Sequence, residues 1–399
     1  MYGLLKHGPR LIRVGLVLAR HNVIPQSELA KAPAMVRLAF SAARLVAGKP
    51  KGTASLNAAL VDLGPSYIKF GQFMATRPDF VGIERAGELA ALQDRLPPFD
   101  QALARVEIEK EFGKPVDQVF SYLSEPVAAA SIAQVHRAKT VDGRDVAVKI
   151  LRPGIEKQFR ADMESQMFAA RMIERWSKPA RRLRLVESVA TLRQTVEREM
   201  DLPMEAAAMS EMAENTRGDE RFRVPDVDWQ HTTRRILTSE WIDGVPLNEP
   251  GKLKNCGVDL KELSVQVVQS FLQHAIRDGF FHADMHQGNL FVDDSKRLVA
   301  VDFGIMGRLS VKDRLYLAEI LYGFVKRDYR RVSEVHFEAG YVPGHHTVED
   351  FAQALRSIGE PIMDRQAEDI SMGRLLGQLF EVTARFDMVT QPQLLLLQK

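Results

Sequence analysis

Two polar clusters close together in the sequence have the residue types that phosphoryl transfer requires. Residues 282–289 read H-A-D-M-H-Q-G-N, which places Asp284 and Asn289 five positions apart, and Asp302-Phe303-Gly304 follows. In phosphoryl transfer, one carboxylate orients or deprotonates the nucleophile, while an Asn and a second Asp hold Mg²⁺ against the phosphates. The order of the clusters therefore predicts Asp284 as the catalytic base, with Asn289 and Asp302 as the metal ligands.

A lysine upstream has the setting of a phosphate-binding lysine. The segment Val146-Ala147-Val148-Lys149-Ile150 places Lys149 among apolar residues on an expected strand, from which it could reach the α- and β-phosphates. Read alone, Lys149 would be an edge-strand lysine with its tip in solvent. The nucleotide-binding interpretation depends on the two clusters that follow it in order.

The loop before this lysine contains no glycine. Where a protein kinase has a glycine-rich loop, residues 128–135 read A-A-A-S-I-A-Q-V. Because alanine lacks the ready access of glycine to positive φ, the loop should be stiffer and should approach phosphates less closely. We predict that the nucleotide contacts Ala128, Ala129, Ala130 and Ser131, with a phosphate geometry unlike that of an ordinary kinase.

The elements that position these residues are a helical start, a mixed middle and a helical end. Expected helices cover 65–76, 100–112, 155–176 and 187–215, and expected strands cover 127–140, 144–151, 223–228, 235–240, 290–292 and 298–301. A capped helix is expected to start at 310–314, and no A-P-E triplet follows Asp302. This leaves no room for the activation loop of an ordinary kinase.

Composition narrows the class of protein. A chain of 399 residues with 45% hydrophobic residues can bury a large core, in two lobes or domains. The formal charge of +2 gives no support to nucleic-acid binding. The single cysteine, Cys256, excludes an intramolecular disulfide and a cysteine metal cluster, which fits a reducing compartment.

The N-terminal segment is strongly basic. Residues 1–52 contain nine Lys and Arg but only one acidic residue, Glu28, and no run of about 18 apolar residues occurs in the chain. Arg10, Arg13 and Arg20 share one arc of an expected helix, although Val17 interrupts it. Two interpretations stay open, a solvated helical face and contact with an anionic membrane surface.

Motifs across most of the chain resemble those of the UbiB family, the kinase-like proteins tied to ubiquinone biosynthesis. The alanine-rich loop, A-V-K-I at 147–150, H-A-D-M-H-x-G-N and D-F-G occur in that family's order. Two further motifs are K-x-G-Q at 69–72, followed by T-R-P-D at 76–79, and E-x-D at 199–201. The resemblance runs from about residue 54 to 391. The chain departs from the family at Ala133, often glycine, and at Gln287, often proline.

The resemblance implies an α+β fold of the protein-kinase-like, two-lobe type: a small β-rich N-lobe, a helical C-lobe, and an all-α N-terminal extension packed over the active site. We expect a basic N-terminal helical segment at 1–52 and a helical extension with K-x-G-Q at 53–120. An N-lobe at 121–242, with a helical insertion and E-x-D, and a C-lobe at 243–399 should follow. An apolar run at 394–399 suggests a truncated C-terminus.

The resemblance also assigns further site residues. Lys69 and Gln72 share one helix face and should point into the catalytic cleft, where Glu199 and Asp201 face Lys69 or a metal. The partner of Lys149 stays open, because ordinary kinase spacing favours Glu164 and the family match favours Glu205. Adenine should lie near Glu240 and Ile242.

The expected activity is that of a Mg²⁺-dependent, ATP-binding (or ADP-binding) atypical kinase or ATPase that supports ubiquinone biosynthesis at the membrane surface. Expected partners are an isoprenoid lipid or quinone precursor, an anionic membrane and other ubiquinone-biosynthesis proteins, but no nucleic acid. The protein should be cytoplasmic and peripheral on a bacterial inner membrane, with anchoring completed by a missing C-terminal segment. Two alternatives are a small-molecule kinase of the aminoglycoside or choline type and a catalytically silent scaffold that binds nucleotide or lipid. Lys69, Gln72 and the alanine loop argue against the first; intact Lys149, Asp284, Asn289 and Asp302 argue against the second.

Overall fold

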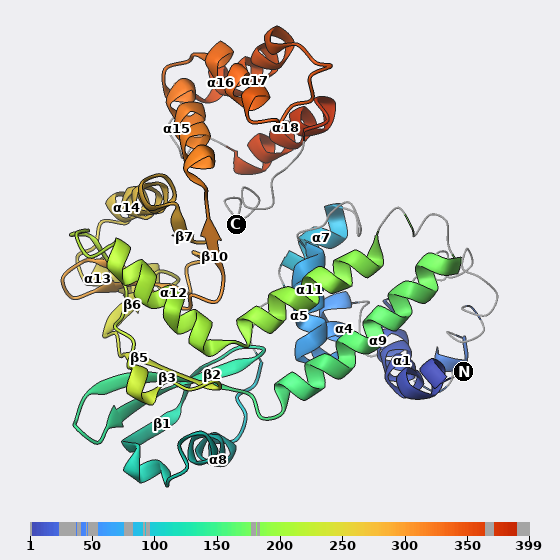
Figure 1. The fold of residues 1–399 in the computed structure, drawn as a ribbon, viewed down its shortest axis with the longest axis vertical. Coiled ribbons are helices and arrows are strands. Elements are labelled where there is room, and N and C mark those ends of the chain that lie inside the picture. The colour runs from blue at the N-terminus through green and yellow to red at the C-terminus, as the bar shows by residue number, and fades with distance from the viewer. Residues whose placement is uncertain are drawn as a thin grey trace. The chain divides into compact units, whose positions relative to one another are not determined.

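A computed structural model gives the fold (Figure 1). It describes residues 2–23, 37, 41–44, 46, 55–75, 83–90, 92, 96–176, 181, 184–363 and 371–388. Most of the basic segment after residue 23, the T-R-P-D motif and the apolar run at 394–399 therefore lie outside the described residues. The chain divides into two units, residues 1–206 with 227–241, and residues 207–226 with 242–399. The domain boundaries expected from the sequence stay predictions.

An antiparallel sheet organises the first unit. Its strands follow the order β1 (Phe120–Ala129), β2 (Ala133–Thr140), β3 (Asp145–Leu151) and β5 (Ile236–Glu240). The prediction of one strand over 127–140 was wrong, because the chain reverses between β1 and β2. The N–H of Ala130 donates to the carbonyl of Ala133 across this turn, at 2.8 Å.

The alternation of side chains along β3 determines on which face of the sheet Lys149 lies. Val146, Val148 and Ile150 are almost completely buried, and they share a core with α8 (Gln101–Phe112) and the 3-10 turn η1 (Val116–Gln118). Because side chains alternate along a strand, Lys149 lies on the opposite face. The expected helix at 100–112 thus packs on the sheet, with Asp100 as its N-cap.

In the first unit, helices that precede the sheet in the chain pack against helices that follow β3. The insertion after β3 forms α9 (Ile155–Trp176) and α11 (Leu185–Glu199), which lie side by side (Figure 1). The N-terminal helices are α1 (Tyr2–Arg20), α4 (Leu56–Leu63), α5 (Pro65–Ala75) and α7 (Ile83–Ala90). α1 contacts α9, and α5 contacts both α9 and α11. The N-terminal extension is therefore docked on the insertion.

Gly71 of the K-x-G-Q motif lies close to two leucine side chains, which would have to shift to make room for a larger residue. A Cβ at position 71 would lie 2.5 Å from Leu60 and 2.8 Å from Leu92, closer than side chains can approach. α5 is also joined to α9 by a buried hydrogen bond of 2.9 Å, in which the hydroxyl of Ser66 donates to Asp162. Burial, with Asp162 nearby, raises the pKa of Tyr67 to about 12. The buried face of α5 therefore packs closely against its neighbouring residues.

The single helix predicted over 187–215 is broken in two. α11 ends at Glu199 and α12 (Leu202–Asn215) begins after Met200 and Asp201. Pro203 lacks a backbone N–H and is tolerated in the first turn of a helix but not inside one. The carboxylate of Asp201 accepts from the N–H of Met204 at 3.3 Å, which satisfies a donor of the new first turn.

Two small sheets support the polar clusters in the second unit. One has the order β4 (Phe222–Arg223), β9 (Leu298–Ala300), β8 (Leu290–Asp293) and β6 (Gly244–Pro246). The other pairs β7 (Phe280–His282) with β10 (Met306–Arg308). The predicted hairpin of β8 and β9 is confirmed. The strand expected at 223–228 shrinks to β4 and an isolated bridge from Val227 to Ser239, which belong to different units.

Helices make up the rest of the second unit. They are α13 (Pro250–Asn255), α14 (Leu260–Gln273), the π-helical η3 (His274–Asp278), α15 (Val311–Val325), α16 (Tyr329–Glu338), α17 (Val348–Met363) and α18 (Met372–Arg385). A capping box of Ser310 and Asp313 starts α15, as predicted. η2 (Trp229–His231) lies in the first unit. Among the helices of the described residues, none combines the length and the apolar character that crossing a membrane requires.

Candidate nucleotide site

Lys149 forms a buried ion pair with Glu205. Its Nζ lies 2.7 and 2.9 Å from the two carboxylate oxygens, and the Glu205 side chain is only 3% exposed. The spacing-based candidate Glu164 was wrong, because it lies on α9 and pairs with Lys6 at 2.8 Å. Ordinary kinase spacing fails here since α9 and α11 are inserted between β3 and the helix that carries the partner.

The alanine-rich loop is held by an arginine that sequence reasoning missed. The guanidinium of Arg152 donates to the carbonyl of Ala130 at 2.8 and 3.0 Å, and to that of Pro97 at 3.0 Å. Ala128 and Ala129 remain in the ladder with β2, and Ser131 is completely buried. The hydrogen bonds from Arg152 therefore restrain this loop, in addition to the low backbone flexibility that follows from its lack of glycine. Arg152 directly follows β3, and its position offered no signal of this role.

Lys69 is paired with Glu199. The Nζ of Lys69 lies 2.7 Å from Oε2 of Glu199, and both side chains are about nine-tenths buried. This ion pair joins α5 to the end of α11. The nearby Gln72 donates to the carbonyl of Leu92 at 3.5 Å. Of the two acidic residues proposed to face Lys69, the structure thus pairs the first with it.

We expect the Lys69–Glu199 pair to show strong coupling in a double-mutant cycle. Lys69→Ala or Glu199→Gln alone leaves the opposite charge buried and uncompensated, so each should lower the free energy of unfolding by roughly 3 kcal/mol. The double variant should cost less than the sum of the two, as measured by denaturant unfolding. The exposed pair of Arg193 and Glu197 on α11 is a matched control, which should give a coupling energy below about 1 kcal/mol. Additive costs at Lys69 and Glu199 would reject the pair as a unit.

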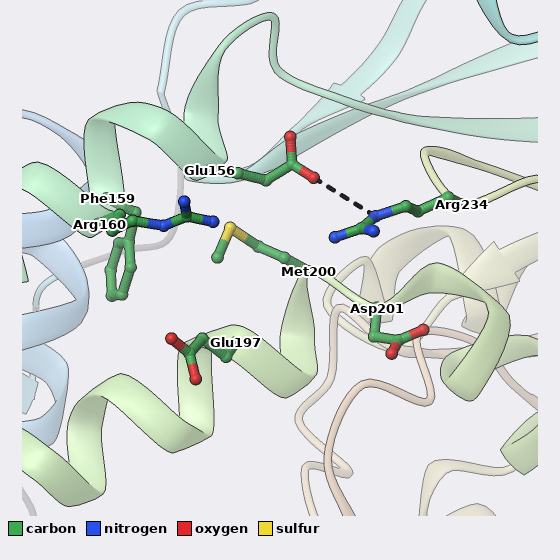
Figure 2. Close-up of a pocket in the computed structure, with 7 residues that line it drawn as sticks. All are labelled: Glu156, Phe159, Arg160, Glu197, Met200, Asp201 and Arg234. Carbon is green, nitrogen blue, oxygen red and sulfur yellow. Dashed lines mark ion pairs between the residues drawn. The ribbon is translucent and has the colours of Figure 1, made fainter.

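A cavity of about 430 Å³ lies beside the E-x-D motif (Figure 2). It is lined by Glu156, Phe159, Arg160, Glu197, Met200, Asp201 and Arg234. Figure 2 shows Glu156 paired with Arg234, with 3.8 Å between the charged groups. Asp201 borders this cavity, whereas Glu199 is bonded to Lys69. The structure therefore gives the two carboxylates of E-x-D different surroundings.

In the second unit, His282 ties the catalytic loop to the D-F-G segment. Its Nδ1 accepts from the N–H of Asp284 at 3.1 Å, and its Nε2–H donates to the carbonyl of Val301 at 3.2 Å. Burial lowers the pKa of His282, which keeps the ring neutral and lets one nitrogen donate while the other accepts. The ring also packs edge-on against Phe303. The sequence signal for this role was the position of His282, two residues before the predicted base.

Asn289 and Asp302 present oxygen atoms that suit Mg²⁺. The buried side-chain amide of Asn289 donates to the carbonyl of Asp284 at 3.2 Å, so its oxygen is the atom left for a cation. The N–H of Val301 donates to the carbonyl of Asn289 at 2.9 Å, which joins the two segments. Asp302 has a φ of +61°, a conformation unusual for a residue other than glycine. Amide and carboxylate oxygens are the ligands that Mg²⁺ prefers.

The residues expected near adenine lie at the end of β5. Glu240 is the last residue of β5, and the N–H of Trp241 donates to the carbonyl of Asp145 at 3.2 Å. The guanidinium of Arg137 lies 5.0 Å from the centre of the Trp241 ring. Ile242 follows and is half-buried. The role of Glu240 and Ile242 in nucleotide binding stays a prediction.

Comparisons with known proteins agree with these motifs. Residues 91–336 match the ABC1 atypical kinase-like domain, and residues 355–399 match the UbiB helical domain. The chain is 40% identical to the "Probable protein kinase UbiB" of Marinobacter nauticus, over 98% of this chain and 73% of that protein. It is 44% identical to the protein of the same name from Pseudomonas aeruginosa, over 87% of this chain and 66% of that protein. The chain thus spans about two thirds to three quarters of the length of these relatives.

A solved structure supports the fold class. The Rv3197–erythromycin complex of Mycobacterium tuberculosis matches with a TM-score of 0.52 and 23% sequence identity, over 88% of this chain and 94% of that one. At this identity the likeness concerns the fold alone. Together with the ABC1 domain match, it confirms the predicted kinase-like α+β fold. The domain matches and the identities over most of the chain establish the rest: this chain belongs to the UbiB family of atypical kinase-like proteins, the family involved in ubiquinone biosynthesis.

Proposed function

We propose that this protein is a Mg²⁺-dependent atypical kinase or ATPase that binds ATP (or ADP) and supports ubiquinone biosynthesis at a membrane surface. The observation that carries the proposal is the hydrogen-bonded arrangement of Asp284, Asn289 and the segment before Asp302. A neutral, buried His282 and the amide of Asn289 hold this arrangement together.

Each polar residue has a distinct task in this proposal. Asn289 and Asp302 hold Mg²⁺, which neutralises charge on the phosphates when it is bound. Asp284 orients the attacking hydroxyl or water and accepts its proton. Lys149 binds the α- and β-phosphates, and Glu205 holds its ammonium in position. The buried pair keeps the long lysine side chain ordered, so less conformational freedom is lost when phosphate binds.

The acceptor is proposed to be a small molecule or water rather than a peptide. α15 begins at Val311, shortly after Asp302, and its capping box uses Ser310 and Asp313. This short connection cannot supply the long activation loop on which ordinary kinases bind peptides. An isoprenoid lipid or a quinone precursor suits an enzyme of this family.

Phosphate release from ATP tests the proposal. We expect Mg²⁺-dependent phosphate release that rises with anionic vesicles containing an isoprenoid quinone precursor, and we expect Asp284→Asn to lower its rate by about 10²–10⁴-fold. Vesicles without the precursor and the precursor without vesicles separate the contributions of surface and substrate. Release that needs no Mg²⁺, or that is unchanged in Asp284→Asn, would contradict the proposal. Nucleotide binding without turnover under every condition would favour the scaffold alternative.

The proposed membrane surface includes α1. Lys6 and Arg10 form ion pairs with Glu164 and Asp162 of α9, so part of the basic face is used within the protein. Arg13 and Arg20 are exposed and share one face, since they are seven residues apart. Beside them, Ile12 is 64% exposed. We propose that this remaining face contacts anionic lipid.

We expect removal of this charge to weaken vesicle binding. Each Arg near an anionic surface contributes roughly 1 kcal/mol, so Arg13→Gln with Arg20→Gln should reduce partitioning by up to about thirtyfold at low salt. The effect should decrease steeply with ionic strength because salt screens it. Arg105→Gln with Arg193→Gln removes two exposed charges elsewhere and is the matched control. Flotation that is independent of salt would point to apolar insertion instead.

A further inference from the structure

Two histidines and an aspartate converge in the second unit, at a position that the nucleotide site does not use. His345 and His346 lie in the connection between α16 and α17, and Asp387 follows α18. The Nε2 atoms of both histidines lie 3.4 Å from the same carboxylate oxygen of Asp387. Among the described residues, these three side chains form a group whose potential ligand atoms lie close enough together to hold one metal ion.

The distances suit a shared metal ion better than direct hydrogen bonds. An N–H···O bond typically spans about 2.7–3.2 Å, so 3.4 Å is long for both contacts. Zinc binds imidazole nitrogen and carboxylate oxygen at about 2.0–2.1 Å with tetrahedral geometry, which sets neighbouring ligand atoms about 3.3 Å apart. The two contacts with Asp387 therefore approximate two edges of a zinc tetrahedron that meet at the carboxylate oxygen. One oxygen close to two nitrogens is the pattern that such a site requires.

The backbone at Asp387 provides an independent observation. The N–H of Met388 donates to the carbonyl of Thr383, and that of Asp387 to Ala384, as in a Schellman motif that ends a helix. Asp387 has a φ of +46° at the position where glycine is strongly preferred. The helix end itself would be served better by glycine. Aspartate tolerates this conformation, and the turn places its carboxylate close to the two histidines.

His346 is already held in place and has an unused nitrogen. Its ring packs against Phe386, at 5.1 Å between ring centres, and Phe386 is buried in the core of α15 to α18. The Nε2 of His346 is shielded from solvent and makes no hydrogen bond with any of the described residues. A buried polar atom without a hydrogen bond is costly unless something satisfies it. His345 is exposed, so the position stays accessible to an ion from solution.

We propose that His345, His346 and Asp387 bind a zinc ion or a similar divalent transition-metal ion. Two imidazoles and one carboxylate favour such ions over Mg²⁺ and Ca²⁺, which prefer oxygen ligands. Three protein ligands leave a fourth position for water or an exchangeable group. The ion would join the loop before α17 to the end of α18. The nearby family-domain boundaries fall at residues 336 and 355, so the link connects the helical domain to the segment between the two domains.

Zinc binding to the tag-free chain, without nucleotide or Mg²⁺, tests the proposal. We expect one zinc per chain by isothermal titration. Cobalt bound in its place should give the intense visible absorption of a tetrahedral complex without thiolate bands, because Cys256 is not a ligand. Amide hydrogen exchange at 383–388 should slow when zinc is added, because the bound ion should stabilise the turn that ends α18. His345→Ala and His346→Ala should each weaken binding by more than about tenfold.

Asp387→Gly separates metal binding from folding. Glycine fits the positive φ, so this variant should fold at least as well as the parent in the absence of metal, yet lose the zinc response. Glu381→Gln removes an exposed carboxylate of α18 and is the matched control, which should bind zinc normally. Asp302→Asn should also bind zinc normally, because the nucleotide site is not involved.

Three outcomes would overturn the proposal. The first is unchanged zinc binding in His346→Ala or Asp387→Gly. The second is loss of zinc binding in Asp302→Asn, which would assign the ion to the nucleotide site. The third is equal slowing of hydrogen exchange at 383–388 in the parent and in Asp387→Gly.

Discussion

Asp284→Asn should lower the rate of phosphate release by about 10²–10⁴-fold and leave the Kd for Mg²⁺-nucleotide within severalfold. The carboxylate acts on the proton of the nucleophile, whereas the phosphates are bound by other groups. Asparagine has nearly the same shape, and two contacts that hold this loop use the backbone of Asp284 and are kept in the variant: its N–H donates to His282 and its carbonyl accepts from Asn289. The loop should therefore keep its conformation in the variant.

Rate and affinity must be measured separately for this variant. Single-turnover phosphate release gives the rate, and equilibrium binding of nucleotide gives the Kd. Asp294→Asn changes an exposed carboxylate in the turn between β8 and β9 and is the matched control, with parental values for both. A large loss of affinity with turnover retained would assign Asp284 to nucleotide binding rather than to proton transfer.

Asp302→Asn should remove Mg²⁺-dependent nucleotide binding. Removing a residue that supports a metal ligand typically weakens metal affinity by roughly 10–100-fold. Loss of a charged ligand itself should weaken Mg²⁺-dependent nucleotide binding by more than this. Asparagine is well suited to this test because, like aspartate, it tolerates the positive φ found at position 302. An alanine variant would combine the loss of a ligand with backbone strain.

Titration of nucleotide with and without Mg²⁺ measures this effect. In the parent chain, Mg²⁺ should tighten binding, whereas in Asp302→Asn the two titrations should coincide. Asp294→Asn again serves as the control and should keep the full response to Mg²⁺. An unchanged Mg²⁺ response in Asp302→Asn would falsify the assignment of this residue as a metal ligand.

Much of the fold could be predicted where the signals are local. The bounds of α9 were predicted from its apolar periodicity, and the hairpin of β8 and β9 was predicted from a polar turn between two short apolar runs. Ser310 and Asp313 marked the start of α15 because the two residues cap each other. The errors arose where a break depends on a single residue. Pro203 ends one helix and starts the next, and Ala130 begins a turn inside what looked like one strand.

The partners of the charged residues could be predicted only in part. The family resemblance favoured Glu205 as the partner of Lys149, which the structure confirms, whereas ordinary kinase spacing favoured Glu164. Arg152 was missed because its target is the carbonyl of Ala130, and a backbone carbonyl has no sequence signature. Similarly, His345 and His346 carry no signal of Asp387, which lies beyond another helix.

The sequence by itself determined the chemical identity and order of Lys149, Asp284, Asn289 and Asp302. Those residues lie in short loops and strands whose conformation depends on their neighbours in the chain, so their types and spacing are informative. Only the tertiary structure decided that Lys69 meets Glu199, that Lys149 meets Glu205 and that two histidines meet Asp387. Such pairs depend on how helices pack, and packing follows the fit of whole buried faces rather than the charge of single residues.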